Sequence, residues 1–217
     1  MLAYSGRLAL FMILIIFDLN TGQPIKKDQY MKRMLISVII CTRNRTDCIG
    51  QCLTSLAQQT SRPDELIIID SSDTPLISVD LFNNFFNTTV FQHTSLKYKH
   101  SQPGLTRQRN IGIELTTGDV IYFFDDDVIL NVDYIKQMQR IFAGHPHYAG
   151  GMGTITNLNP ISKINYVLRN LFLTHRNYSS GMFTSSGMPT HAYGTTQFKN
   201  VEALGGCCCA YRSLVFK

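Results

Sequence analysis

Three consecutive carboxylates, Asp125, Asp126 and Asp127, directly follow the apolar run Val120–Phe124. The run has the length and composition of a buried strand, so the acidic side chains come where that strand leaves its sheet. Like charges held this close favour protonation unless a cation neutralises them. The triplet therefore predicts a hard divalent metal ion bound together with a phosphate-bearing ligand. The alternative is a solvated acidic loop or a helix N-cap.

Two further polar segments follow apolar runs in the same way. Leu35–Cys41 and Glu65–Ile69 are rich in β-branched residues, and the polar segments Thr42–Thr46 and Asp70–Pro75 come directly after them. Between the runs, apolar residues recur at three- and four-residue spacing over Cys48–Leu56, which indicates a helix packed on a sheet. This alternation predicts an α/β fold with a doubly wound sheet, which binds ligands at the carboxyl ends of its strands.

The remaining pattern extends the same architecture. A helix is expected to begin near Ser78, and a short strand is expected over Leu96–Tyr98. Helices are also expected over Thr106–Leu115 and Tyr134–Phe142, the first of them leading into the strand before the acidic triplet. Residues 150–200 are less regular and rich in Gly, Ser and Thr toward their end, so we expect there either a long loop that covers a site or a mobile segment.

Length and charge limit the classes of protein that fit. The chain has 217 residues, of which 44% are hydrophobic, enough to bury one substantial core. Its formal net charge is +5, but residues 1–33 hold five Lys or Arg against two Asp, which leaves only +2 on the remainder. The body of the chain therefore lacks the basic surface of a nucleic-acid-binding protein, and we expect no nucleic acid among its partners.

The first 33 residues are expected to form an N-terminal extension with a short apolar segment, Leu8–Phe17. Ten residues are too few to cross a bilayer as a helix, which takes about 20. No Ala-x-Ala-like cleavage site follows the segment, which argues against a secretory signal. Two alternatives remain, an upstream extension of the true start and a segment that associates with a membrane. We expect a cytoplasmic protein that the segment can hold at the inner face of the membrane.

The six cysteines indicate a reducing compartment. Their spacing fits neither a disulfide framework nor the paired ligands of a zinc site, because three of them, Cys207–Cys209, are consecutive. We expect them to act as small buried hydrophobic residues.

Four segments together resemble the family 2 glycosyltransferases. Their order and spacing carry the resemblance, which runs from about Leu35 to Phe216. It implies a GT-A fold, a Rossmann-like three-layer α/β sandwich with a mostly parallel sheet, over residues 34–217. The resemblance also implies that the C-terminal part of this domain is truncated. The four segments are Ile36–Arg45, Glu65–Pro75, Gly104–Ile113 and Phe124–Asp127.

Matching positions imply a pocket for a nucleotide-sugar donor. Thr42, Asn44 and Arg45 stand in the loop where the family holds the nucleobase and ribose. Asp70 matches the carboxylate that accepts a hydrogen bond from the base. Its alternative role is a turn or N-cap aspartate that shapes the backbone.

The segment after Gly104 matches the family segment that lines the donor pocket near the diphosphate. Guanidinium groups bind phosphate bidentately and stay charged, which suits Arg107 and Arg109 to that place. Two residues apart on a helix, these arginines cannot lie on one face. We assign Arg107 and Asn110 to the pocket, while Arg109 has the alternative of a structural ion pair with the acidic triplet.

The triplet corresponds to the Asp-x-Asp element of the family. The resemblance implies that Asp125 and Asp126 contact the donor and that Asp127, together with Asp125, coordinates the metal ion. Mg²⁺ or Mn²⁺ is expected, because carboxylate and phosphate oxygens are hard ligands.

The reaction implied is attack of an acceptor hydroxyl on the anomeric carbon of the donor, with inversion, in the synthesis of a glycan or polysaccharide. The acceptor is expected to be a glycan or lipid-linked. The general base that the family supplies is expected beyond Lys217, so the alternative is a catalytically incompetent fragment that only binds a sugar nucleotide. A metal-dependent nucleotidyltransferase fits less well, since Thr42–Arg45 contains no glycine.

Overall fold

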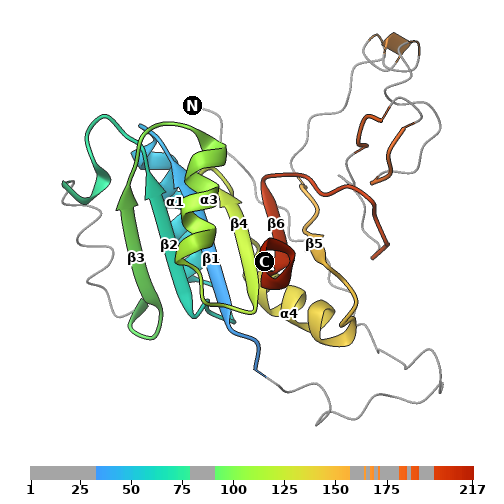
Figure 1. Ribbon diagram of the computed structural model, residues 1–217, viewed down its shortest axis with the longest axis horizontal. Helices are drawn as coiled ribbons and strands as arrows, with labels where there is room; N and C mark the ends of the chain where they lie inside the picture. Colours follow the sequence, from blue (N-terminus) through green and yellow to red (C-terminus); the bar gives the residue numbers. More distant parts are fainter. Residues whose placement is uncertain are drawn as a thin grey trace. The chain divides into compact units, whose positions relative to one another are not determined.

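The computed structural model describes residues 33–78, 91–156, 164, 167–168, 171, 181–184, 187–190 and 198–217. Over these residues the chain folds as a sheet with helices on both of its faces (Figure 1). The strands are β1 Ile36–Thr42, β2 Glu65–Asp70, β3 Ser95–His100, β4 Val120–Asp125, β5 Gly150–Met152 and β6 Cys208–Arg212. The helices are α1 Thr46–Ala57, α3 Leu105–Leu115 and α4 Tyr134–Gly144, with short 3-10 turns η2 Leu76–Ser78 and η4 Ser213–Phe216.

The strands lie in the order β3-β2-β1-β4-β6-β5. Strands β1 to β4 run parallel, and β6 runs antiparallel to both β4 and β5. The order reverses at β1, which lies between β2 and β4. In a doubly wound sheet such a reversal opens a crevice beyond the carboxyl ends of the central strands, where ligands bind.

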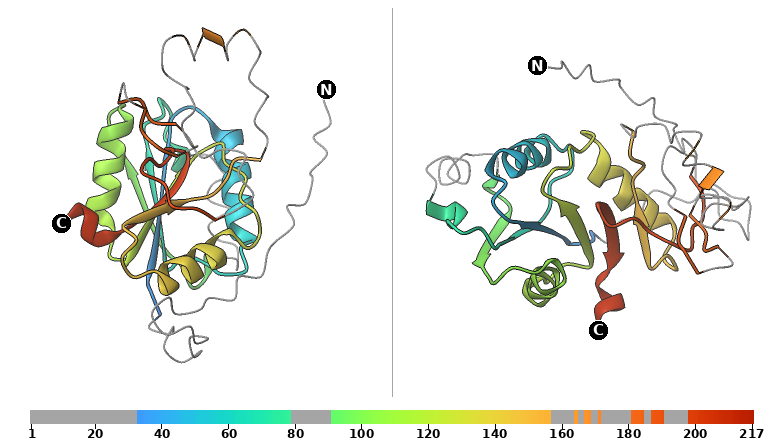
Figure 2. Two further views of the ribbon diagram at one scale, coloured as in Figure 1. Left: turned by 90° about the vertical axis from the view of Figure 1, so that its right-hand side faces the viewer. Right: turned by 90° about the horizontal axis from the view of Figure 1, so that it is seen from above.

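Helices α1 and α4 cover one face of the sheet and α3 covers the other (Figure 2). The central strands β1, β2 and β4 are buried on both sides, which explains why they are nearly continuous apolar runs rather than alternating ones. Val38, Ile40 and Tyr122 belong to the core on the side of α1 and α4. Ile39 and Phe123 point to the opposite side, toward α3.

Helix α3 packs very closely on the sheet. A Cβ atom at Gly112 would lie 2.6 Å from Cγ2 of Ile39, so only glycine allows the observed spacing. The helix begins after Gly104, whose φ of 142° lies in a region that favours glycine. These two glycines fix both the start of α3 and its depth on the sheet, and with them the positions of the side chains near its N-terminus.

The first four strands and three helices confirm the predicted elements to within a few residues at each end. The antiparallel strands β5 and β6 were not predicted, since Gly150–Met152 and Cys208–Arg212 lack the β-branched composition that marks the central strands. Most of the helix expected from Ser78 lies outside the described residues, as do the N-terminal extension and most of the predicted loop over 150–200. Within the described part of the chain, no helix is both long enough and apolar enough to span a bilayer.

Candidate functional site

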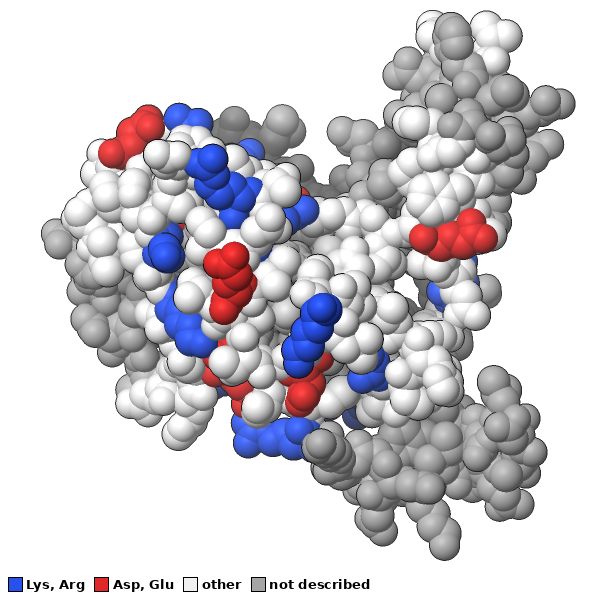
Figure 3. Space-filling model, viewed as in Figure 1, with Lys and Arg blue, Asp and Glu red and all other residues white. Residues whose placement is uncertain are grey.

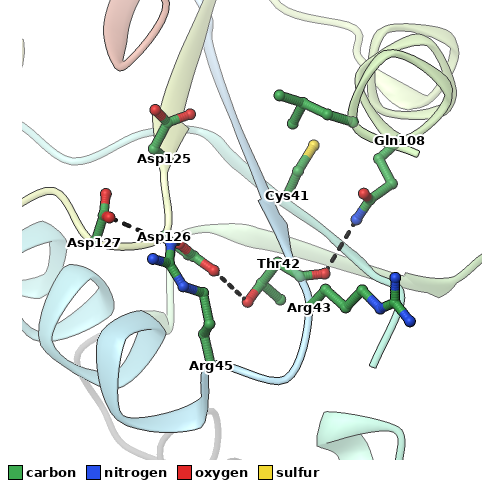
Figure 4. A pocket seen from close by; sticks show the side chains of 9 residues that line it. Cys41, Thr42, Arg43, Arg45, Gln108, Asp125, Asp126 and Asp127 are labelled. Carbon is green, nitrogen blue, oxygen red and sulfur yellow. Dashed lines mark hydrogen bonds and ion pairs between the residues drawn. The ribbon is translucent and has the colours of Figure 1, made fainter. Parts of the chain in front are cut away.

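A pocket of about 330 Å³ lies where β1 and β4 end and α3 begins (Figure 4). Cys41 pairs with Asp125 in the sheet and Thr42 pairs with Asp70, so the register alone brings the polar strand ends together. Several of the predicted site residues therefore lie together at the expected edge of the sheet. The lining residues are Cys41, Thr42, Arg43, Arg45, Leu105, Gln108, Asp125, Asp126 and Asp127.

Asp126 is the buried member of the acidic triplet, with 5% of its surface exposed. Its Oδ2 accepts a hydrogen bond of 2.7 Å from the hydroxyl of Thr42, and its Oδ1 accepts one of 2.7 Å from Nη1 of Arg45. Thr42 is the last residue of β1 and Arg45 precedes the first turn of α1, so both donors are set by the β1–α1 connection. Both oxygens of this buried carboxylate therefore accept hydrogen bonds, one of them from a charged guanidinium group.

Asp127 is more open, with 52% of its side chain exposed. Its Oδ2 lies 3.3 Å from Nη1 of Arg45, which thus bridges Asp126 and Asp127. Because both partners are half exposed, water screens this second contact and it contributes little to stability. The carboxylate of Asp127 is therefore available to a ligand.

Asp125 pairs with an arginine on the other side of the pocket. Nη2 of Arg109 donates to Oδ1 of Asp125 at 3.1 Å and to the carbonyl oxygen of Gly206 at 3.0 Å. The pKa of Asp125 is still raised, first by burial, with a smaller contribution from the charge of Asp127, although the Arg109 charge opposes both. A further positive charge beside Asp125 would therefore favour its ionised form.

The carboxylate oxygens of Asp125 and Asp127 are ligands that fit a magnesium or manganese ion. Among the described residues, nothing donates to the second oxygen of Asp125 or of Asp127, so each carboxylate keeps one oxygen for a cation. The described residues contain no cluster of three or more His, Cys, Asp or Glu that would enclose a metal. A magnesium ion needs no such cage, because it is commonly held by one or two carboxylates, with water and phosphate oxygens completing its shell.

Gln108 belongs to the site although sequence reasoning did not select it. Its side chain is buried, and Nε2 donates to the carbonyl oxygens of Thr42 and Ile69 at 3.1 and 2.9 Å. It thereby ties α3 to the carboxyl ends of β1 and β2. A single glutamine between two arginines carries no pattern that could have predicted this role.

Asp70 makes the contacts of a turn aspartate, which was the alternative to its predicted contact with the nucleobase. It is fully buried, and its two oxygens accept hydrogen bonds from the backbone N–H groups of Ser72 and Leu76 and from the hydroxyl of Tyr98. Burial alone would raise the pKa of Asp70, but hydrogen bonds from Ser72, Tyr98 and Leu76 outweigh it and lower the pKa. The carboxylate therefore fixes the loop after β2.

Asn44 joins the loops after β1 and β2. Its Nδ2 donates to Oδ2 of Asp73 at 2.8 Å, and its Oδ1 accepts the N–H of Asp73 at 2.9 Å. Its own N–H donates to Oγ of Ser72. Asn44 has a φ of 53°, a left-handed conformation that asparagine tolerates better than most residues.

The two arginines of α3 diverge, as their spacing predicted. Arg107 is exposed and donates to Oε1 of Gln102, whereas Arg109 turns to Asp125. Neither Arg107 nor the exposed Asn110 is among the residues that line the pocket. Their predicted contact with a diphosphate stays a prediction, and Arg109 takes the alternative role of pairing with the triplet.

The chain shares its fold with two solved structures. It is similar to the crystal structure of a 1–349 fragment of TarS from Staphylococcus aureus, with a TM-score of 0.54 and 18% identity, over 84% of this chain and 48% of that one. It is also similar to the mannosyltransferase PcManGT from Pyrobaculum calidifontis, solved with GDP-Man and Mn²⁺. There the TM-score is 0.53 and the identity 14%, over 84% of this chain and 46% of the other.

Sequence comparison gives the family. A profile described as Glycosyl transferase family 2 matches residues 37–217, and the chain belongs to this family. It is 32% identical over 116 residues to an uncharacterized glycosyltransferase of Haemophilus influenzae, covering 53% of this chain and 45% of that protein. It is 30% identical over 110 residues to the O-antigen chain rhamnosyltransferase RfbN of Salmonella typhimurium, covering 51% and 34%. The chain thus spans less than half the length of these curated relatives.

Proposed function

We propose that this domain binds a nucleoside diphosphate sugar and transfers the sugar, with inversion, to an acceptor hydroxyl. The observation that carries the proposal is the grouping of three carboxylates and two arginines at the carboxyl ends of β1 and β4. Family membership supports sugar transfer as the reaction class. A phosphate-bearing donor and a divalent cation together suit such a mixed cluster better than either would alone.

Asp125 and Asp127 would hold Mg²⁺ or Mn²⁺, since each keeps an oxygen without a donor from the described residues. When bound, the ion would offset the negative charge that builds on the departing diphosphate. Asp126 is the carboxylate that orients Thr42 and Arg45 rather than a metal ligand, because both of its oxygens already accept hydrogen bonds.

Arg45 is the arginine best suited to the donor phosphates. Its side chain is 52% exposed and lines the pocket, so it can turn from Asp127 to a phosphate without leaving Asp126. Thr42 and Asn44 would border the nucleobase and ribose. Arg107 and Asn110 would approach the diphosphate from the N-terminal half of α3, and Asp70 would support the base-binding loop rather than contact the base.

The acceptor is proposed to be a glycan or a lipid-linked sugar, in the synthesis of a polysaccharide. The names of two relatives support this class, the rhamnosyltransferase RfbN and a glucosyl-dolichyl phosphate glucuronosyltransferase of Haloferax volcanii. On the face seen in Figure 3, Lys and Arg alternate with Asp and Glu, which does not favour nucleic acid as a partner there. We place the reaction in the cytoplasm or at the inner face of the membrane.

Thermal unfolding with a panel of sugar nucleotides tests the proposal. A ligand that binds only the folded chain raises its Tm by mass action. We expect at least one uridine, guanosine or thymidine diphosphate sugar to raise the Tm in Mn²⁺ or Mg²⁺, and the rise to vanish in EDTA. No rise with any donor would overturn the proposal. Binding without transfer to any acceptor would support the binding-only alternative.

A further inference from the structure

Arg109 joins three segments that are far apart in the sequence. It extends from α3, its Nη2 binds Asp125 at the end of β4, and the same nitrogen binds the carbonyl oxygen of Gly206 just before β6. The guanidinium carbon also lies 5.9 Å from the centre of the Phe123 ring. Only 29% of the side chain is exposed, so water screens these contacts less than those of Arg45.

The segment before β6 also contacts the triplet directly. The backbone N–H of Asp125 donates to the carbonyl oxygen of Cys207 at 3.0 Å, and Phe124 pairs with Cys208 in the sheet. Arg109 therefore adds a side-chain link beside an existing backbone link. Together the two links join one carboxylate of the candidate donor site to the segment that enters β6.

Arginine suits this position for a geometric reason. Each terminal nitrogen of the guanidinium carries two N–H groups, so Nη2 can donate to Asp125 and Gly206 at once. Its planar group can lie over an aromatic ring while it makes these bonds, which the compact ammonium of lysine does less well. Its charge also offsets part of the repulsion among the three carboxylates.

We propose that Arg109 is a positioning residue that orients the carboxylate of Asp125 for the donor and holds residues 205–207 beside it. The first half of this proposal rests on the proposed function, because it concerns donor binding. The second half concerns the chain without any ligand. The two halves are measured separately, so that failure of one can be told from failure of the other.

The ligand-free test is hydrogen exchange in Arg109→Ala, Arg109→Lys and the wild type. We expect amides of residues 205–208 and of Asp125 to exchange at least tenfold faster in Arg109→Ala, because the side-chain link is lost. Arg109→Lys should give an intermediate rate. Arg140→Ala, which removes an exposed arginine from α4, is the matched control and should leave these amides unchanged. Equal rates in all four proteins would overturn the structural half.

The donor test is a double-mutant cycle with Asp125→Asn. The probe is the sugar nucleotide that most raises the Tm of the wild type, and the Kd is measured by calorimetry in Mn²⁺. We expect Arg109→Ala to raise the Kd about tenfold in the wild type and less than twofold in Asp125→Asn, since Arg109 acts through Asp125. Equal increases in both backgrounds would overturn the positioning role.

Two further outcomes separate the possible failures. If Arg109→Ala does not fold, Arg109→Lys takes its place in the cycle, with a smaller increase in Kd that should again be confined to the wild-type background. If no sugar nucleotide binds the wild type, the proposed function and the donor half both fail. The hydrogen-exchange rates then still test whether Arg109 holds residues 205–207 beside Asp125.

Discussion

Replacing Thr42 by valine should destabilise the chain without creating a cavity. The two side chains have nearly the same shape, but valine cannot donate to Asp126. Thr42 is 3% exposed and Asp126 is 5% exposed, so water cannot readily replace the 2.7 Å hydrogen bond. A hydrogen bond to a charged group contributes about 1.5–3 kcal/mol. We expect Thr42→Val to lower the free energy of unfolding by about this amount.

Urea unfolding at pH 7 measures the free energy of unfolding. Circular dichroism and fluorescence both monitor the transition, and their agreement tests for two-state behaviour. Thr42→Ser is the matched control, because it keeps the hydroxyl and loses only a methyl group, at a cost of about 1 kcal/mol. The Tm of Thr42→Val should fall by about 2–4 °C for each kcal/mol lost.

Measuring Thr42→Val in a protein that also carries Asp126→Ala isolates the contribution of the hydrogen bond between Thr42 and Asp126. Without the carboxylate, the hydroxyl of Thr42 has lost its acceptor, so Thr42→Val should then cost less than about 0.5 kcal/mol. A loss equal to that in the wild-type background would refute the reasoning, as would a Thr42→Val protein within about 0.5 kcal/mol of the wild type.

Two other predictions concern the framework that positions the site. Burial alone would raise the pKa of Glu65. Hydrogen bonds from Lys97 and from neighbouring hydroxyl and backbone groups outweigh burial and lower the pKa to about 2. The ionised form therefore stabilises the fold above the unfolded pKa of about 4.3, and this stability is lost as the pH falls toward 2. Glu65→Gln should cost about 3 kcal/mol at pH 7 in urea unfolding, and its difference from the wild type should narrow steadily below pH 4.3; a constant difference would contradict the linkage. Gly112→Ala should cost about 1–3 kcal/mol because its Cβ would meet Ile39, whereas Gly50→Ala, with nothing within 4 Å, should stabilise the chain by about 0.5–1 kcal/mol. Equal changes in unfolding free energy for the two glycines would contradict the close packing of α3.

The central sheet could be predicted because its signal is local. Continuous β-branched runs at Ile36–Thr42 and Glu65–Asp70, each followed by a polar segment, are typical of buried parallel strands. The antiparallel strand Cys208–Arg212 gave no such signal. It is a strand because β4 and β5 pair with it on either side, which depends on tertiary contacts rather than on its own composition.

The site could be located from the sequence, but the orientation of its side chains could not. The ends of the apolar runs placed the triplet at the carboxyl edge of the sheet, and the structure has it there. Which of the three carboxylates is buried depends on the turn that follows β4 and on the donors Thr42 and Arg45, some 80 positions earlier in the chain. Helical geometry predicted that Arg107 and Arg109 would diverge, yet the rotation of α3 about its own axis, which its packing on the sheet sets, decides which of them reaches Asp125.

Donor binding by Asp127→Asn tests the central claim most directly. The sugar nucleotide that most raises the Tm is titrated by calorimetry into the wild type, Asp127→Asn and Glu114→Gln, in Mn²⁺ and in EDTA. Glu114 is an exposed carboxylate on α3 and serves as the matched control. We expect binding by the wild type and Glu114→Gln in Mn²⁺ alone, and a Kd at least tenfold higher for Asp127→Asn with the fold intact by circular dichroism. Metal-dependent binding of wild-type strength by Asp127→Asn would contradict the assignment of the acidic triplet as the metal end of a sugar-nucleotide pocket.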